Sequence, residues 1–156
     1  MAKKQASDNT ICRNRQARFR YELIENIEAG VVLSGTEVKS LRAGGGSLDE
    51  SFARLRDGEV FLFGFHIPPY ANAGPYNHDP TRPRKLLLKR REIDKIEPKL
   101  TQKGLTLVPV SAYFNERGLV KIRLALARGK TFGDKRQNLK RKTHQRDMAQ
   151  AMRRRR

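Results

Sequence analysis

The chemically active residues of this chain are mostly cations. The 156-residue sequence holds 34 lysines and arginines but only 16 aspartates and glutamates, which gives a formal net charge of +18. Guanidinium and ammonium groups in such excess bind phosphates. The composition therefore predicts a polyanionic partner.

The cysteine, histidine and carboxylate residues of this chain show no spacing that is typical of an active site. Cys12 is the only cysteine, and the histidines are scattered at positions 66, 78 and 144, so no disulfide or metal-ligand spacing exists. The adjacent carboxylates Asp49 and Glu50 are typical of solvated caps, and residues 44–46 (GGG) lack the lysine of a phosphate-binding loop. We expect neither an enzyme nor a bound cofactor or metal.

The positive charge is concentrated at the C-terminal end. Residues 128–156 hold 12 basic and two acidic residues, a net charge of +10, whereas the other 127 residues carry +8. The tail, residues 129–156, has too few sizeable apolar residues for a core. We expect it to be disordered in isolation and helical on a partner, with Asp134 and Gln137 as a capping pair.

The tail also lacks an apolar stripe. Leu139 and Met148 are nine residues apart, which places them on opposite sides of a helix, so a polyanion is favoured over a membrane or an apolar groove. The N-terminal arm, residues 1–17, is polar and basic and is expected to be mobile. Because no segment resembles a signal peptide or a membrane span, we expect a cytoplasmic protein. We also expect it to be a monomer.

The folded unit is expected to comprise residues 18–128. Residues 18–33 alternate apolar and polar side chains and predict a strand, a bend at residues 28–30 and a second strand. Residues 36–42 predict a short helix that ends at the following glycines.

Residues 51–67 contain two β-rich runs around the dipeptide Asp57-Gly58, which is typical of a tight hairpin. The alternative is a helix that begins at Ser47 and Glu50.

The second half of the unit continues with a proline-rich surface loop at residues 68–83 and a short strand at residues 84–89. Residues 90–103 predict a helix in which Pro98 begins a second turn after a kink. Residues 106–128 predict two apolar strands, with Pro109 at an edge or a bulge.

This inventory amounts to about six antiparallel strands with two or three short peripheral helices. For a basic domain, it predicts a mainly β fold, an antiparallel barrel of the OB type that leaves one face for nucleic acid. An open α+β sheet is the alternative.

Three long blocks of the sequence resemble the signature blocks of a known family. They are EAGVVLSGTEVKSLRAG at residues 28–44, DPTRPRKLLLKRREI at residues 79–93 and LALARGKTFGDKR at residues 124–136. In order and spacing, residues 14–136 are similar to the SsrA-binding protein (small protein B) family.

This resemblance implies a bacterial RNA-binding factor of ribosome rescue (trans-translation) that is not an enzyme and has an OB-type barrel. Such a protein binds the tRNA-like domain of transfer-messenger RNA (tmRNA) and delivers it to the vacant decoding site of a stalled ribosome. It stands in for the missing anticodon stem beside 16S rRNA, and its tail occupies the empty mRNA channel.

The resemblance also implies which residues bind RNA. On the barrel they are Asn14, Phe19, Glu28, Leu87, Lys89 and Lys121. In the ribosome-binding tail they are Gly129, Lys130, Phe132, Asp134, Lys135, Arg136, Lys140, Arg141 and Lys142. Lys121 can neutralise a phosphate and Asn14 can hydrogen-bond a base edge or a ribose. A carboxylate repels phosphates, so Glu28 is expected to accept from base amino or imino groups.

Three positions depart from the family pattern. Lys89 stands where many relatives have Asn, and Phe19 stands where they often have His. Gly133 replaces the His that precedes the Asp-Lys-Arg triplet, so stacking on ribosomal RNA there depends on Phe132.

Two other functions stay open from the residues alone. A ribosomal structural protein with an rRNA-binding tail would also be small and basic. An RNA-processing enzyme would cleave RNA, and the lack of a recognisable catalytic motif in the sequence argues against it.

Overall fold

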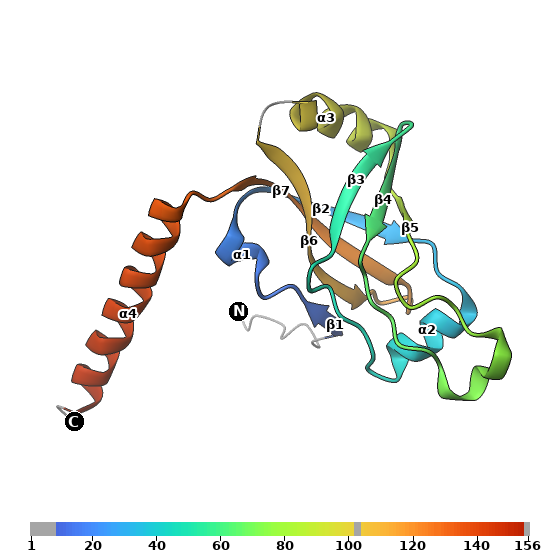
Figure 1. Ribbon diagram of the computed structural model, residues 1–156, viewed down its shortest axis with the longest axis horizontal. Helices are drawn as coiled ribbons and strands as arrows, with labels where there is room; N and C mark the ends of the chain where they lie inside the picture. Colours follow the sequence, from blue (N-terminus) through green and yellow to red (C-terminus); the bar gives the residue numbers. More distant parts are fainter. Residues whose placement is uncertain (1–8, 102–103, 155–156) are drawn as a thin grey trace.

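The barrel is built from antiparallel strands. The computed structural model describes residues 9–101 and 104–154. Within these residues, six strands close a circuit in the order β6 (Leu105–Phe114), β3 (Phe52–Arg56), β4 (Glu59–Phe63), β5 (Arg84–Leu87), β2 (Tyr21–Val31) and β7 (Val120–Gly129). Strand β7 pairs back to β6 (Figure 1). The predicted antiparallel barrel is confirmed, and the open-sheet alternative is wrong.

Strand β2 is continuous, so the predicted bend at residues 28–30 is wrong. Tyr21 to Gly30 pair with β7, and Gly30 and Val31 pair with β5, which closes the barrel. A Cβ atom on Gly30 would lie 3.2 Å from the Cβ of Leu87. The glycine therefore permits a close approach of two strands rather than a break, and the irregularity of β2 is a bulge between Leu23 and Glu25.

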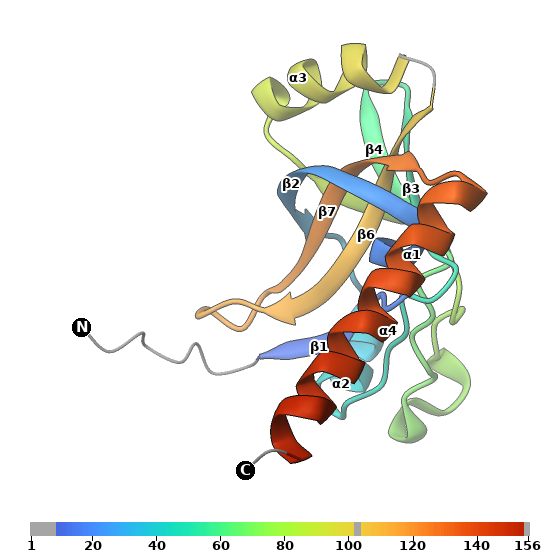
Figure 2. The ribbon, with the colours of Figure 1, turned by 90° about the vertical axis from the view of Figure 1, so that its left-hand side faces the viewer.

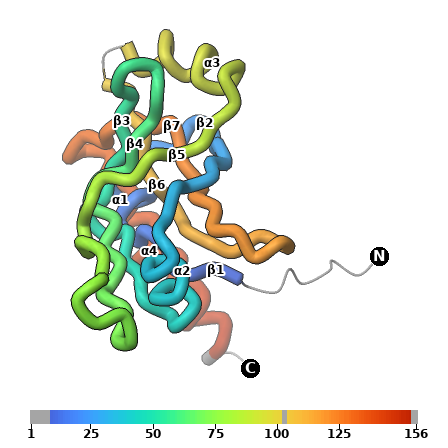
Figure 3. The backbone as a smooth tube through the Cα atoms, turned by 90° about the vertical axis from the view of Figure 1, so that its right-hand side faces the viewer, coloured from blue at the N-terminus to red at the C-terminus, as the bar shows by residue number. Residues whose placement is uncertain are grey.

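The hairpin prediction is confirmed. Strands β3 and β4 pair around Asp57 and Gly58, whose φ angles are 51° and 74°, and the alternative helix is wrong. Figure 3 shows β3, β4 and β5 side by side. The predicted irregularity at Pro109 is a bulge of β6 between Pro109 and Ser111.

The N-terminal arm is partly ordered, so the prediction of a mobile arm is wrong from Thr10 onward. Strand β1 (Thr10–Arg13) pairs with β6, and residues 1–8 lie outside the described residues. Helix α1 (Ala17–Arg20) replaces the predicted start of a strand at Arg18. Ala17 is 1% exposed and packs with Val108 and Ala127 on the outside of the barrel, which holds this turn in place.

Two further helices cover the barrel near its ends. Helix α2 (Gly35–Arg42) confirms the predicted short helix, and Ser34 and Glu37 form the capping box at its start. Helix α3 (Arg90–Thr101) runs through Pro98, and the last two residues of its predicted range, 102 and 103, lie outside the described residues. A short 3-10 helix, η1 (Ala71–Tyr76), lies in the predicted surface loop.

The core lies inside the barrel. Alternate residues of each strand point inward, as the period of two requires. Apolar side chains that are at most 2% exposed include Val60, Leu62, Phe65, Ile67, Ile122, Leu124 and Leu126. These residues belong to one connected apolar cluster, to which α2 contributes Leu41 and α3 contributes Ile96.

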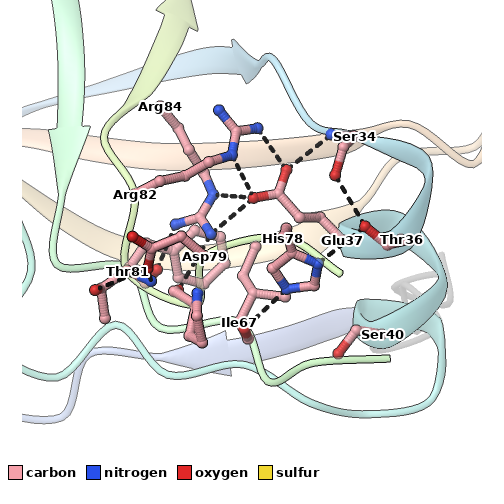
Figure 4. Close-up of polar contacts among 12 residues, drawn as sticks. Ser34, Thr36, Glu37, Ser40, Ile67, His78, Asp79, Thr81, Arg82 and Arg84 are labelled. Atoms are coloured by element: carbon pink, nitrogen blue, oxygen red, sulfur yellow. Dashed lines mark hydrogen bonds and ion pairs between the residues drawn. The ribbon is translucent and has the colours of Figure 1, made fainter. Parts of the chain in front are cut away.

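A buried ion cluster ties α2 to the chain that enters β5 (Figure 4). Both oxygens of Glu37, a residue with 0% exposure, accept hydrogen bonds, from Arg82 Nε at 2.8 Å and Nη2 at 2.6 Å and from Arg84 Nε at 2.8 Å. The backbone N–H of Ser34 donates to Glu37 at 2.8 Å. Burial alone would raise the pKa of Glu37, but the hydrogen bonds from Arg82 and Ser34 and the charge of Arg84 lower it to about 2.

The C-terminal tail forms helix α4 (Phe132–Arg154). Figure 1 shows it to one side of the barrel, and Figure 2 shows it running away from the end that carries α3. From Lys140 to Arg153 every side chain is exposed. The helix is thus an extension rather than a part of the core, and its disorder in isolation stays a prediction.

The low pKa of Glu37 predicts that the protein loses stability in acid. A depressed folded-state pKa stabilises the fold above the unfolded value of 4.5, and this contribution disappears as the pH falls from 4.5 toward 2. We expect a loss of roughly 3 kcal/mol in the free energy of unfolding from this group, measured by urea denaturation across that range.

The matched control is Glu59→Gln, which removes a half-exposed carboxylate paired with Lys85 at 2.5 Å and should leave the acid-dependent loss intact. Glu37→Gln should remove most of the loss and lower stability at neutral pH by about 3–5 kcal/mol, because Arg84 stays buried without its partner. An unchanged acid-dependent loss in Glu37→Gln would contradict this assignment.

Candidate RNA interface

The outer face of β2, β7 and β6 carries a cluster of charged and polar side chains. Register pairs Glu28 of β2 with Arg123 of β7, and it pairs Lys121 of β7 with both Gly30 of β2 and Tyr113 of β6. Lys121 and Arg123 alternate with the buried Ile122, so both point outward. Glu28 and Lys121, which the sequence predicted, therefore share one face.

Leu87 lies at the edge of the same face. It pairs with Gly30 and its side chain is 53% exposed, which is unusual for a leucine in a strand. Lys89, two residues further on, is exposed and precedes α3, where its backbone N–H donates to the Glu92 carboxylate at 2.8 Å. The structure thus brings Glu28, Leu87 and Lys121 together around the glycine at which the barrel closes.

Tyr113 and Arg123 were missed by the sequence predictions. The Tyr113 hydroxyl donates to the Glu28 carboxylate, and the Arg123 guanidinium lies over the Tyr113 ring, 5.3 Å from its centroid. Burial and the hydrogen bond to Glu28 raise the pKa of Tyr113 to about 12. Strand alternation places Arg123 beside Lys121, so that residue was detectable from the sequence, whereas the bond of Tyr113 was not.

An open groove extends this face toward the start of the tail. Its lining includes three cations, Arg18, Arg123 and Lys130, and one carboxylate, Glu22. Lys130 Nζ donates to the backbone oxygen of Arg18 at 2.7 Å, and Lys130 N donates to Arg20 O at 2.9 Å. A polyanionic strand lying in the groove would therefore contact both the barrel and the segment that leads to α4.

Asn14 and Phe19 lie apart from the Glu28 face. Asn14 Nδ2 donates to Pro109 O at 3.1 Å and its Oδ1 accepts from Gln16 N at 3.2 Å, so the amide holds the bulge of β6. One N–H of this amide remains for another partner. Phe19 is on α1 rather than in a strand, and its ring is 40% exposed.

The tail helix begins with a capping box. Thr131 Oγ1 donates to Asp134 Oδ2 at 2.7 Å, Thr131 N donates to the same oxygen at 3.2 Å, and Asp134 N donates back to Thr131 Oγ1 at 3.4 Å. The predicted capping pair of Asp134 with Gln137 is therefore wrong, because Asp134 occupies the third helical position. The hydrogen bonds from Thr131 also lower the pKa of Asp134.

The predicted ribosome-binding residues lie along the link and the helix. Phe132 is 85% exposed, and Lys135 Nζ lies 5.3 Å from the centroid of its ring. The cations Arg136, Lys140, Arg141 and Lys142 are exposed, while Gly129 and Lys130 connect β7 to the helix. The cations from Arg136 onward form a solvated positive surface beyond the barrel face, whereas Lys130 also lines the groove that extends that face.

The described part of the chain holds no group of three or more His, Cys, Asp or Glu side chains arranged to bind a metal ion. Burial raises the pKa of the Cys12 thiol to about 11, so this cysteine is a poor nucleophile. No helix of the described residues is long and apolar enough to cross a membrane.

Comparison with known proteins decides the family. The model of the family described as SmpB protein matches residues 11–154. The chain belongs to the SmpB family. The match covers the six barrel strands and the whole of α4, so it includes both the body and the tail helix.

Individual SmpB relatives agree over nearly their full length. The SsrA-binding protein of Nostoc sp. is 53% identical over 97% of this chain and 98% of the relative. The SsrA-binding protein of Thermosynechococcus vestitus is 53% identical over 96% of this chain and 98% of the relative. A solved SmpB chain, from the structure "tmRNA-SmpB: a journey to the center of the bacterial ribosome", is 53% identical with a TM-score of 0.65, over 78% of this chain and 85% of that chain.

Proposed function

We propose that this protein binds the tRNA-like domain of tmRNA and delivers it to the vacant decoding site of stalled ribosomes. There it stands in for the missing anticodon stem, and the ribosome resumes on the reading frame of tmRNA. The family assignment and the relatives named SsrA-binding proteins support this proposal, as does a structural neighbour described with tmRNA and the ribosome.

One observation carries the proposal on physical grounds. The outer face around Gly30 combines the cations Lys121 and Arg123 with the carboxylate of Glu28. Cations alone would bind any RNA backbone, whereas a carboxylate repels phosphates and can accept hydrogen bonds from base N–H groups. The face therefore fits recognition of a particular RNA rather than general binding to phosphates.

The barrel residues have different roles in this proposal. Lys121 and Lys89 contact phosphates, Glu28 accepts from a base, and Leu87 packs against a sugar or a base. Asn14 uses its remaining amide N–H, and Phe19 stacks on a base from α1. Asn14 follows β1 and Phe19 is on α1, so they would contact the RNA from elements other than the strands that carry Glu28 and Lys121.

The tail acts on the ribosome in this proposal. The link and the first turn of α4 lie near the decoding centre, where Phe132 stacks on 16S rRNA in place of the residue lost at Gly133. Beyond them, Lys140, Arg141 and Lys142 contact the phosphates that line the empty mRNA channel. The helix is then the bound form of a segment that is disordered in solution, and mRNA and tail are alternative occupants of one path.

The protein is proposed to be a monomeric binding factor rather than an enzyme. The roles proposed for its residues are contacts to RNA, and none of them is catalytic. Its place of action is the bacterial cytoplasm, where ribosomes translate. Cys12 is half-buried, and desolvation raises the pKa of its thiol, which makes it a poor nucleophile.

The proposed function predicts selective RNA binding. We expect the protein to prefer the tRNA-like domain of tmRNA to an ordinary tRNA by at least about tenfold, the effect of one or two base contacts. The measurement is a competition at fixed salt, because electrostatic attraction alone gives similar affinities for both RNAs. Equal affinity, with near-stoichiometric retention on salt-washed ribosomes from growing cells, would instead indicate a ribosomal structural protein.

Removal of residues 131–156 should separate the two activities. The truncated protein should fold, because both apolar clusters end before residue 128, and it should bind the tRNA-like domain as tightly as the full chain. In a reconstituted translation reaction, the truncated protein should no longer support addition of the tmRNA-encoded peptide tag to stalled chains. Intact tagging by the truncated protein would refute the assigned role of the tail.

A further inference from the structure

Tyr113 reaches across an entire strand to contact Glu28. Tyr113 is on β6 and Glu28 is on β2, and β7 lies between these two strands. In register, Tyr113 lies opposite Lys121, whereas Glu28 lies opposite Arg123, the next outward residue of β7. The tyrosine side chain therefore crosses β7 between two cations.

The partner of Glu28 distinguishes this carboxylate from others on the barrel strands. Glu25 accepts from Lys99 Nζ and Glu59 accepts from Lys85 Nζ, each at 2.5 Å. Among the described residues, Glu28 makes no salt bridge, although Lys121 and Arg123 are its neighbours on β7. It is bonded to a neutral phenol, while the guanidinium of Arg123 lies over the phenol ring.

A phenol donor has a specific effect on a carboxylate. It fixes the orientation of the group without neutralising its charge, so the remaining lone pairs stay available to a ligand. Because the pKa of Tyr113 is raised to about 12, the hydroxyl keeps its proton and remains a donor at every working pH. A salt bridge to Arg123 would instead occupy the lone pairs with a second strong donor.

The geometry points to Tyr113 as a positioning residue: it holds the Glu28 carboxylate ready to accept N–H groups from the edge of an unpaired nucleobase, while Lys121 and Arg123 bind the flanking phosphates. This inference rests on the proposed function and adds its specificity element. Selectivity between RNAs then lies in the pair Tyr113 and Glu28, whereas the two cations supply affinity for any RNA.

The test is a double-mutant cycle with the tRNA-like domain of tmRNA and an ordinary tRNA as competing probes. Tyr113→Phe keeps the ring under Arg123 and deletes only the hydroxyl. We expect it to reduce the preference for the tRNA-like domain by about fivefold to tenfold and to leave tRNA affinity unchanged. Glu28→Gln should reduce the preference at least as much, and the double variant should lose no more than Glu28→Gln alone.

Two controls separate this effect from general damage. Tyr76→Phe deletes the hydroxyl of a tyrosine that is 87% exposed in the loop between β4 and β5, and it should change neither affinity. Arg123→Gln should lower the affinity for both RNAs by a similar factor and reduce the slope of affinity against salt by about one phosphate contact. Thermal melting of each variant identifies any loss of folding. If Tyr113→Phe has a lowered melting temperature, Glu28→Gln still tests base recognition, because its side-chain oxygen can accept from Tyr113.

The outcomes are distinguishable. If the unaltered protein does not prefer the tRNA-like domain, the proposed function fails. If it does, but Tyr113→Phe keeps the full preference, or if the losses from the two substitutions add, the positioning role of Tyr113 is wrong while the function stands.

Discussion

The close approach of β2 and β5 at Gly30 is the constraint on which the rest of the molecule depends. A side chain at this position would meet Leu87, with Cβ atoms 3.2 Å apart. Because β2 leaves β7 and joins β5 there, the sheet closes and Lys121, Gly30 and Leu87 fall in one row. The same contact that completes the barrel therefore assembles its candidate RNA face, with Glu28 two residues away on the outward side.

The ion cluster of Glu37 supports this closure at the start of β5, at the opposite end of the strand from Leu87. Arg84 begins β5 and is completely buried, and its bonds to Glu37 and to the carbonyl of Phe65 fix where the strand starts. A buried ion pair adds little net stability but is costly to break, so it selects one arrangement of α2, the preceding loop and β5. The position of Leu87 on the candidate RNA face follows from that selection.

The sequence was sufficient for the elements whose pattern is local. Asp57-Gly58 specified the hairpin, and alternation along β7 was enough to place Lys121 outward, although Arg123 beside it was not predicted. It was insufficient where tertiary contact decides. Gly30 was interpreted as a break because a glycine that permits close packing and one that permits a turn look alike in sequence. The bond of Tyr113 to Glu28 could not be predicted, since it depends on the register of three strands.

The central claim is that this protein divides its charge between two tasks, with RNA identity read by the less charged barrel and ribosome affinity supplied by the tail. Salt dependence tests this division most directly, because its slope counts phosphate contacts, at about −0.7 per contact for single-stranded RNA. Truncation after Lys130 removes ten lysines and arginines. The account predicts that truncation leaves the salt slope for the tRNA-like domain unchanged to within about one contact and sharply reduces the slope for stalled ribosomes. A similar reduction in both slopes would contradict it.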